Sequence, residues 1–147
     1  MLNSSPIRGF RPACIVIGGT YLLIGASIIA RGAAESMAPY GVPQATLDAP
    51  HYVDAILWVY VHMMVLGAVI TFMGWRARPR PLQRAFARLM LGAHLVYLYL
   101  DLRTSDSAVG NGLYEGAASL GPAVIAGLCT AVFAVLSVAK VAPASQA

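Results

Sequence analysis

The sequence predicts an all-α integral membrane four-helix bundle with both termini in the cytoplasm, and three observations support this fold class. The 147-residue chain is 59% hydrophobic and only 11% charged, which is too little charge to cover a soluble domain of this size. It contains four long apolar stretches. Its basic and acidic residues are concentrated in alternate connections between those stretches.

Each apolar stretch can cross a hydrocarbon core of about 30 Å, which needs about 20 residues in a helix. The expected spans are approximately 13–31, 54–76, 85–102 and 119–139. The third span carries charges near its ends, Arg88 and Asp101. What remains outside the spans is too short for a soluble domain, so we expect one membrane domain over 1–147.

The first span follows two arginines, as the apolar core of a secretory signal peptide does. Its apolar run is longer than a usual signal core, so we expect a retained helix. The outer connection after it, 31–54, contains three prolines. Connections of that length in compact proteins are usually ordered, and the segment ATLDAP is expected to form a short helical turn.

The basic residues identify the cytoplasmic side of the bundle. Arginines precede the first span and cluster in RARPRPLQRAFAR between spans two and three, whereas all six acidic residues lie in or beside the other two connections. This is the positive-inside pattern, which places both termini in the cytoplasm and the chain in the inner (cell) membrane. The basic segment is therefore interpreted as a topology and headgroup anchor rather than a nucleic-acid patch.

Span two begins with polar residues on one helix face. Asp54, Trp58 and His62 are spaced four apart, so they stack along a helix. His62 lies eight residues, about 12 Å, inside the outer surface. The short link to span three contains two prolines, so we expect spans two and three to be adjacent and antiparallel.

Span three carries a matching set. His94, Tyr97 and Asp101 follow the spacing i, i+3, i+7 and share one face. His94 lies about 10 Å from the outer end of its span, close to the level expected for His62.

Facing one another, the two sets would form layers at matching depths. Ionisable groups inside spans nearly always face the bundle interior or a wet cavity, because exposure to lipid costs several kcal/mol. Tyr21 in span one lies at a similar depth, and Arg103 is a candidate partner for a carboxylate. The expected layers are Asp54 with Asp101, Trp58 with Tyr97, and His62 with His94.

Three interpretations of this ladder remain open. The first is an outward-opening polar pocket for a small or lipid-soluble ligand. The second is a clasp that only joins helices, and the third is a haem site with His62 and His94 as axial ligands. Zinc needs three or four ligands, and each carboxylate lies about two turns from the histidines, so no metal site is expected. A buried histidine can shuttle protons, but no nucleophile is evident, and the chain is not assigned as an enzyme.

The two cysteines are interpreted as packing residues. Cys14 and Cys129 are expected at different depths, so no disulfide is predicted.

The opening segment GGTYLLIGASIIARG, followed by a proline- and glycine-rich outer connection, resembles small four-helix membrane proteins of the BphX-like group and, more distantly, the DoxX-like group. BphX-like proteins are associated with aromatic-compound degradation, and DoxX-like proteins include a membrane subunit of a quinone-reducing oxidoreductase. The resemblance implies an accessory or quinone-linked role and transfers no catalytic residue. The expected partners are the bilayer and a larger membrane complex or homo-oligomer, with no nucleic acid; haem or quinone is the candidate cofactor.

Overall fold

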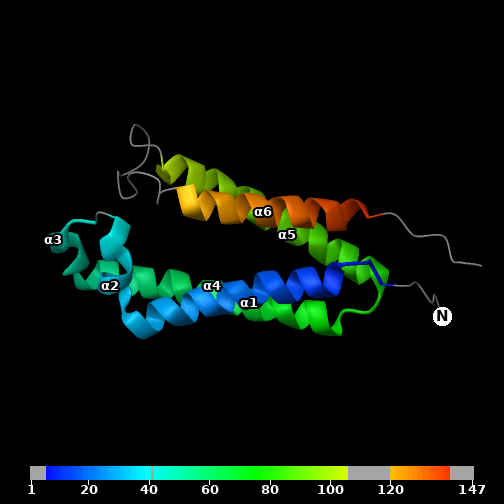
Figure 1. Cartoon of the computed structure of the whole chain (residues 1–147), viewed down its shortest axis with the longest axis horizontal. Helices are drawn as coiled ribbons and strands as arrows, with labels where there is room; N and C mark the ends of the chain where they lie inside the picture. The colour runs from blue at the N-terminus through cyan, green and yellow to red at the C-terminus, as the bar shows by residue number, and fades with distance from the viewer. Residues whose placement is uncertain (1–5, 41, 106–119, 140–147) are drawn as a thin grey trace, which may run out of the picture.

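The computed structural model describes residues 6–40, 42–105 and 120–139, which contain helices and no strand. Asp106, Glu115 and Ser119 in the second outer connection, and Lys140 after the last span, lie outside the described residues. The elements (Figure 1) are α1 (Phe10–Arg31), α2 (Ala33–Met37), the 3-10 helix η1 (Ala38–Tyr40), α3 (Gln44–Leu47), α4 (Pro50–Arg76), α5 (Arg80–Ser105) and α6 (Leu120–Val138).

Four of these helices are long and apolar enough to cross a membrane: α1, α4, α5 and α6. The first three expected spans lie within α1, α4 and α5, and the fourth agrees with α6 to within one residue at each end. The helices α4 and α5 begin before their expected spans, and α5 also continues beyond its span to Ser105. The prediction of a helical fold with four apolar spans is therefore confirmed.

Local sequence sets the ends of these helices. Gly9 and Gly32 flank α1 with φ of 83° and 87°, a backbone conformation that glycine adopts without strain. The Gly32 N–H donates to the carbonyl of Ile28 at 2.9 Å and closes the last turn. Pro50 begins α4, where its missing N–H costs nothing. The segment QATL forms α3, so the short turn expected in ATLDAP is confirmed.

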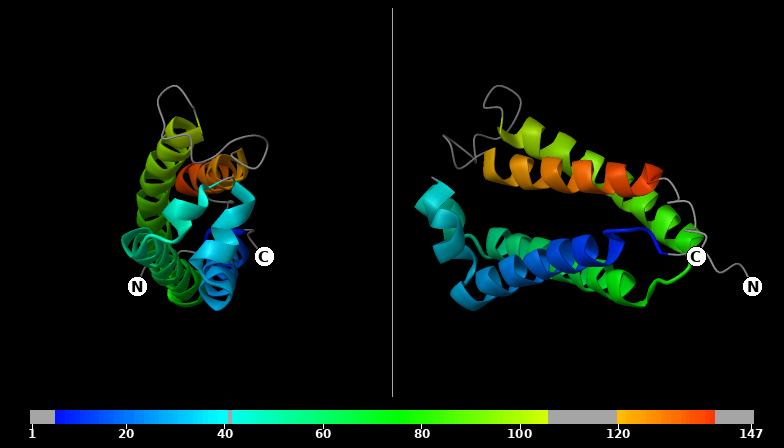
Figure 2. Two further views of the ribbon diagram at one scale, coloured as in Figure 1. Left: turned by 90° about the vertical axis from the view of Figure 1, so that its left-hand side faces the viewer. Right: turned by 45° about the vertical axis from the view of Figure 1, so that its right-hand side comes forward.

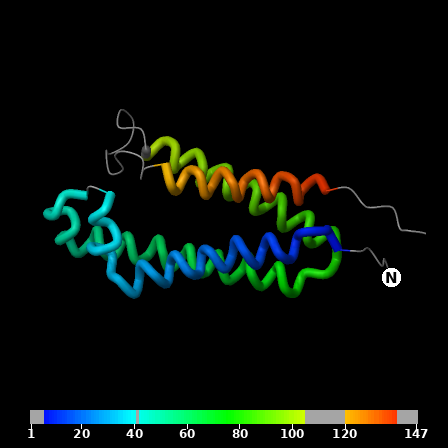
Figure 3. The backbone as a smooth tube through the Cα atoms, in the orientation of Figure 1, coloured from blue at the N-terminus to red at the C-terminus, as the bar shows by residue number. Residues whose placement is uncertain are grey.

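The long helices pack as two close pairs, α1 with α4 and α5 with α6. Figure 2 shows the pairs as two layers, and Figure 3 shows α5 crossing obliquely from the α6 layer toward the link with α4. Within the described part of the chain, α4 and α5 share at most marginal contact. The expected packing of spans two and three against each other was therefore wrong: a short link makes helices antiparallel, but it does not make them the closest partners.

Glycines explain the close pairing of α1 with α4. Gly18 faces Gly67 so closely that a Cβ on Gly18 would lie 2.5 Å from the Gly67 carbonyl oxygen. A Cβ on Gly74 would lie 2.5 Å from the Cβ of Cys14, and a Cβ on Gly25 would collide with Met64. In lipid, helix association is driven by packing, and small residues allow this approach.

The two pairs meet in an aromatic core near the basic end of the bundle. Phe10 of α1 packs edge-on against Phe86 of α5, with ring centroids 6.2 Å apart, and both rings are buried. Phe133 of α6 is fully buried in the same cluster. At the opposite end, the α2–α3 segment folds over the start of α4, where Met37 and Leu47 pack beneath partly buried residues of that helix. The two helix pairs are thus joined at the basic end, whereas at the opposite end the α2–α3 segment covers the start of α4.

Candidate functional site

His94 lies at the centre of a buried polar cluster. Its side chain has no solvent exposure, and its Nδ1 lies 2.7 Å from the carbonyl oxygen of Met90. Because a carbonyl can only accept, Nδ1 carries the proton and donates. In the neutral ring Nε2 is then an acceptor, and the Tyr21 hydroxyl, at 2.8 Å, donates to it. This geometry corresponds to the Nδ1-protonated tautomer of a neutral imidazole.

The Tyr21–His94 bond joins the two helix pairs. Tyr21 belongs to α1 and His94 to α5, and the rings lie nearly parallel with centroids 5.9 Å apart. Cys129 of α6 places its Sγ 4.0 Å from the Tyr21 oxygen, and Phe133 packs against the imidazole at 5.2 Å. Every polar atom of His94 is paired inside the protein, so this cluster is a closed clasp between helices.

His62 makes the same local bond in a different environment. Its Nδ1 lies 2.7 Å from the carbonyl oxygen of Trp58, four residues earlier in α4, as His94 does with Met90. The His62 ring stacks on the Trp58 indole with centroids 4.9 Å apart. Both side chains are exposed, Trp58 by 66%. Within the described chain, neither Nε2 of His62 nor the indole N–H makes a hydrogen bond.

The structure does not assemble the expected ladder. His62 and His94 make no contact with each other: the partner of His94 is Tyr21, and the partner of His62 is Trp58. The layered pocket between spans two and three was therefore wrong in its geometry. Its cause is the rotation of α4, which turns its glycine face toward α1 and its polar face outward.

The remaining predicted site residues lie toward the end of the bundle opposite the basic end. Tyr97 makes a T-shaped contact with the His94 ring, with ring centroids 5.7 Å apart, and is 41% exposed. Asp54 is exposed and Asp101 half-buried. Arg103 is exposed, and no ion pair links it to either carboxylate among the residues that the structure describes.

A haem between the two histidines does not fit this arrangement. Axial ligation needs two imidazole nitrogens directed at one iron, whereas Nε2 of His94 is bonded to Tyr21 and His62 faces outward from another helix pair. Among the described residues, no three His, Cys, Asp or Glu side chains are grouped to hold a metal ion.

Several residues that are important in the structure were not predicted from the sequence. Cys129 was assigned only to packing, yet its sulfur lies beside the Tyr21 hydroxyl. Both cysteines are buried and free, so the absence of a disulfide between them is confirmed. Gln83 was not singled out, although it is buried and its Oε1 accepts the Ile7 N–H at 2.7 Å. A seven-residue repeat of glycines in spans one and two was the available signal for the α1–α4 interface.

Comparison with protein-family models, curated proteins and solved structures finds no match to this chain.

Proposed function

We propose that the protein is a multi-pass protein of the inner membrane, with both termini in the cytoplasm, that binds a flat, lipid-soluble, quinone-like ligand on the outer face of α4.

The proposed orientation in the membrane is based on the distribution of arginines. The start of α1 and the α4–α5 link lie at the same end of the bundle, joined by the Ile7–Gln83 hydrogen bond, and carry most of the arginines. The positive-inside rule assigns that end to the cytoplasm.

The observation that supports the ligand site is the stacked and exposed pair of Trp58 and His62. The pair offers an aromatic surface, an indole N–H donor and an Nε2 acceptor, all on the outside of a membrane-spanning helix. An imidazole acceptor left unpaired among acyl chains is unfavourable. A quinol supplies a flat ring and a hydroxyl that donates to Nε2, and its second oxygen accepts from the indole. A quinone-linked role also agrees with the resemblance to DoxX-like proteins.

Tryptophan fluorescence tests this proposal directly. The chain has two tryptophans, so Trp75→Phe leaves Trp58 as the sole reporter. We expect a short-chain benzoquinol to quench Trp58 saturably in reconstituted protein, above the linear collisional quenching that any quinol produces. His62→Leu should weaken the saturable component at least about tenfold, which corresponds to about 1.4 kcal/mol.

The control variant is His51→Leu, which makes the same chemical change in the first turn of α4, at an exposed position outside the stacked pair. It should leave the half-saturation unchanged. Purely linear quenching, or an equal loss in the His51 and His62 variants, would contradict the ligand proposal.

A second candidate function is that of an accessory subunit whose α4 contacts another membrane protein. The observation that favours it is the low burial of α4, in which the buried residues are Gly67, Ile70 and Gly74. A photo-reactive residue in place of Val65, which is 58% exposed, distinguishes the two in native membranes. A subunit interface gives one protein adduct of defined mass at position 65 and none at Leu23, exposed on α1; an open ligand face gives lipid adducts at both.

A further inference from the structure

The basic end of the bundle contains a pocket formed by two stretches that are distant in the sequence, residues 6–12 and 74–83. The segment before α1 with the start of α1, and the end of α4 with its link, line an open pocket of about 240 Å³. Gln83 fixes two of its walls, because its Oε1 accepts from Ile7 and its Nε2 donates to the carbonyl of Ala77 at 2.8 Å. A buried side chain therefore links the segment before α1 to the α4–α5 link at this pocket.

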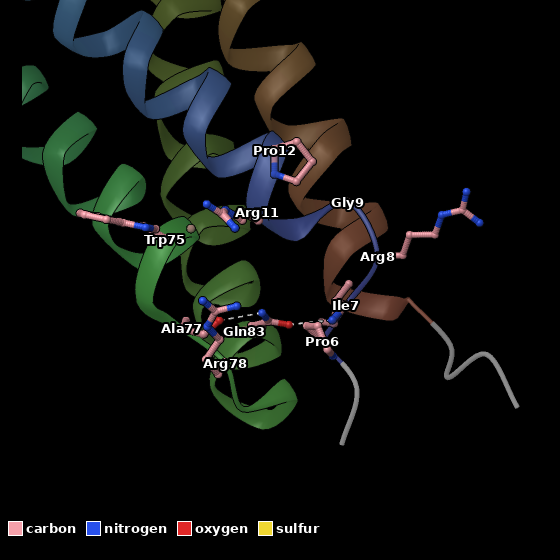
Figure 4. A pocket seen from close by; sticks show the side chains of 11 residues that line it. Pro6, Ile7, Arg8, Gly9, Arg11, Pro12, Trp75, Ala77, Arg78 and Gln83 are labelled. Carbon is pink, nitrogen blue, oxygen red and sulfur yellow. Dashed lines mark hydrogen bonds between the residues drawn. The ribbon is translucent and has the colours of Figure 1, made fainter. Parts of the chain in front are cut away.

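Two guanidinium groups lie at this pocket. In Figure 4 the side chains of Arg11 and Arg78 lie on the same side as Trp75, whereas Arg8 points away. The described lining residues include no aspartate or glutamate, and neither Arg11 nor Arg78 has an ion-pair partner among the described residues. A neighbouring cavity of about 360 Å³ is lined by Trp75, Arg76 and Arg78. Like charges are thus gathered at this pocket, and the described residues that line it supply no counter-charge.

Guanidinium groups favour phosphate, because the planar fork of donors matches its oxygens. The position of the pocket favours the same ligand. It lies at the arginine-rich end of the spans beside an exposed tryptophan, and indole rings concentrate at the headgroup level of a bilayer. Anionic headgroups are bound by basic pockets of this kind on the cytoplasmic side.

We propose that the pocket between Arg11 and Arg78 is a binding site for a phosphate group, with Arg76 and the edge of Trp75 beside it. The phosphate belongs to an anionic phospholipid headgroup or to a soluble phosphate compound. This site is independent of the ligand face on α4, because it lies at the other end of that helix and shares no residue with it.

Native mass spectrometry of the full chain in detergent micelles tests the site. Phosphatidylglycerol, phosphatidylcholine and inorganic phosphate are added in separate titrations to the protein and to Arg11→Gln/Arg78→Gln. We expect the anionic lipid to bind in preference to the zwitterionic one, and the double variant to weaken that binding roughly tenfold. The matched control is Arg88→Gln, an exposed arginine of the same end that does not line the pocket; it should change binding less than twofold.

Trp75 gives a second readout in the Trp58→Phe background, where its emission should shift when the anionic lipid binds. Displacement of the lipid by inorganic phosphate identifies a soluble phosphate compound as the occupant, and failure to displace it identifies the lipid headgroup. Equal binding of both lipids without binding of inorganic phosphate, or an equal loss in the Arg88 variant and the double variant, overturns the proposal. Because Arg11 and Arg78 are exposed, all variants are expected to fold with unchanged near-ultraviolet circular dichroism, and a variant that loses this signal is replaced by Arg→Lys, which retains charge but not the planar fork.

Discussion

Replacing Gly18 by alanine should separate α1 from α4. The added Cβ would lie 2.5 Å from the Gly67 carbonyl oxygen and 2.8 Å from the backbone nitrogen of Thr71. Ordinary contacts begin near 3.4 Å, and backbone atoms cannot rotate aside, so the helices must move apart by roughly 1 Å. Overpacking of this kind costs about 1–3 kcal/mol, and in lipid the lost packing is also the main source of helix association.

The neighbouring Gly19→Ala is the matched control. Nothing lies within 4 Å of a Cβ at Gly19, and both variants gain about the same helix propensity, up to about 1 kcal/mol. The difference between the two free energies of unfolding therefore isolates the interface and should be about 1–3 kcal/mol. Titration with sodium dodecyl sulfate, followed by far-ultraviolet circular dichroism, measures both. Equal midpoints and equal slopes would refute the proposed glycine contact.

Two further predictions concern buried hydrogen bonds. Tyr21→Phe leaves Nε2 of His94 without its donor and should lower the free energy of unfolding by about 1 kcal/mol, whereas Tyr99→Phe, at a position 60% exposed, should have no measurable effect in the same titration. Gln83→Ala removes the bond to the Ile7 N–H and should raise the rate of tryptic cleavage after Arg8 several-fold, as followed by mass spectrometry; an unchanged rate would show that Gln83 does not secure this segment.

The four spans were predictable because twenty apolar residues have a clear signature in the sequence. The rotation of each helix was not, since a span that faces lipid is apolar around most of its circumference. The rule that ionisable groups face inward held for His94 and not for His62. Both imidazoles donate to the carbonyl four residues earlier. This bond satisfies one of the two ring nitrogens within the helix and lowers the cost of an outward orientation.

The contact between α1 and α4, by contrast, has a signal in the sequence. Gly18 and Gly25 in one span, and Gly67 and Gly74 in the next, each repeat at seven residues, a pattern that keeps one seam facing a partner helix. That pattern predicts an α1–α4 interface and, as a consequence, the outward rotation of His62. The hydroxyl of Tyr21 was expected at the depth of the histidines, and the structure shows it bonded to His94. Which of the two histidines it would bond could not be predicted without knowing the rotation of α4.

The pairing of each long helix with its neighbour along the chain has a consequence for biosynthesis. Each hairpin can close soon after its second arm emerges from the ribosome, without waiting for the other half to be translated. Two polypeptides divided at Arg78, expressed from separate transcripts, therefore contain complete hairpins. Reunion of the halves depends on the contacts that bridge them, which include the Phe10–Phe86 and Tyr21–His94 contacts and the hydrogen bonds of Gln83 with Ile7 and Ala77.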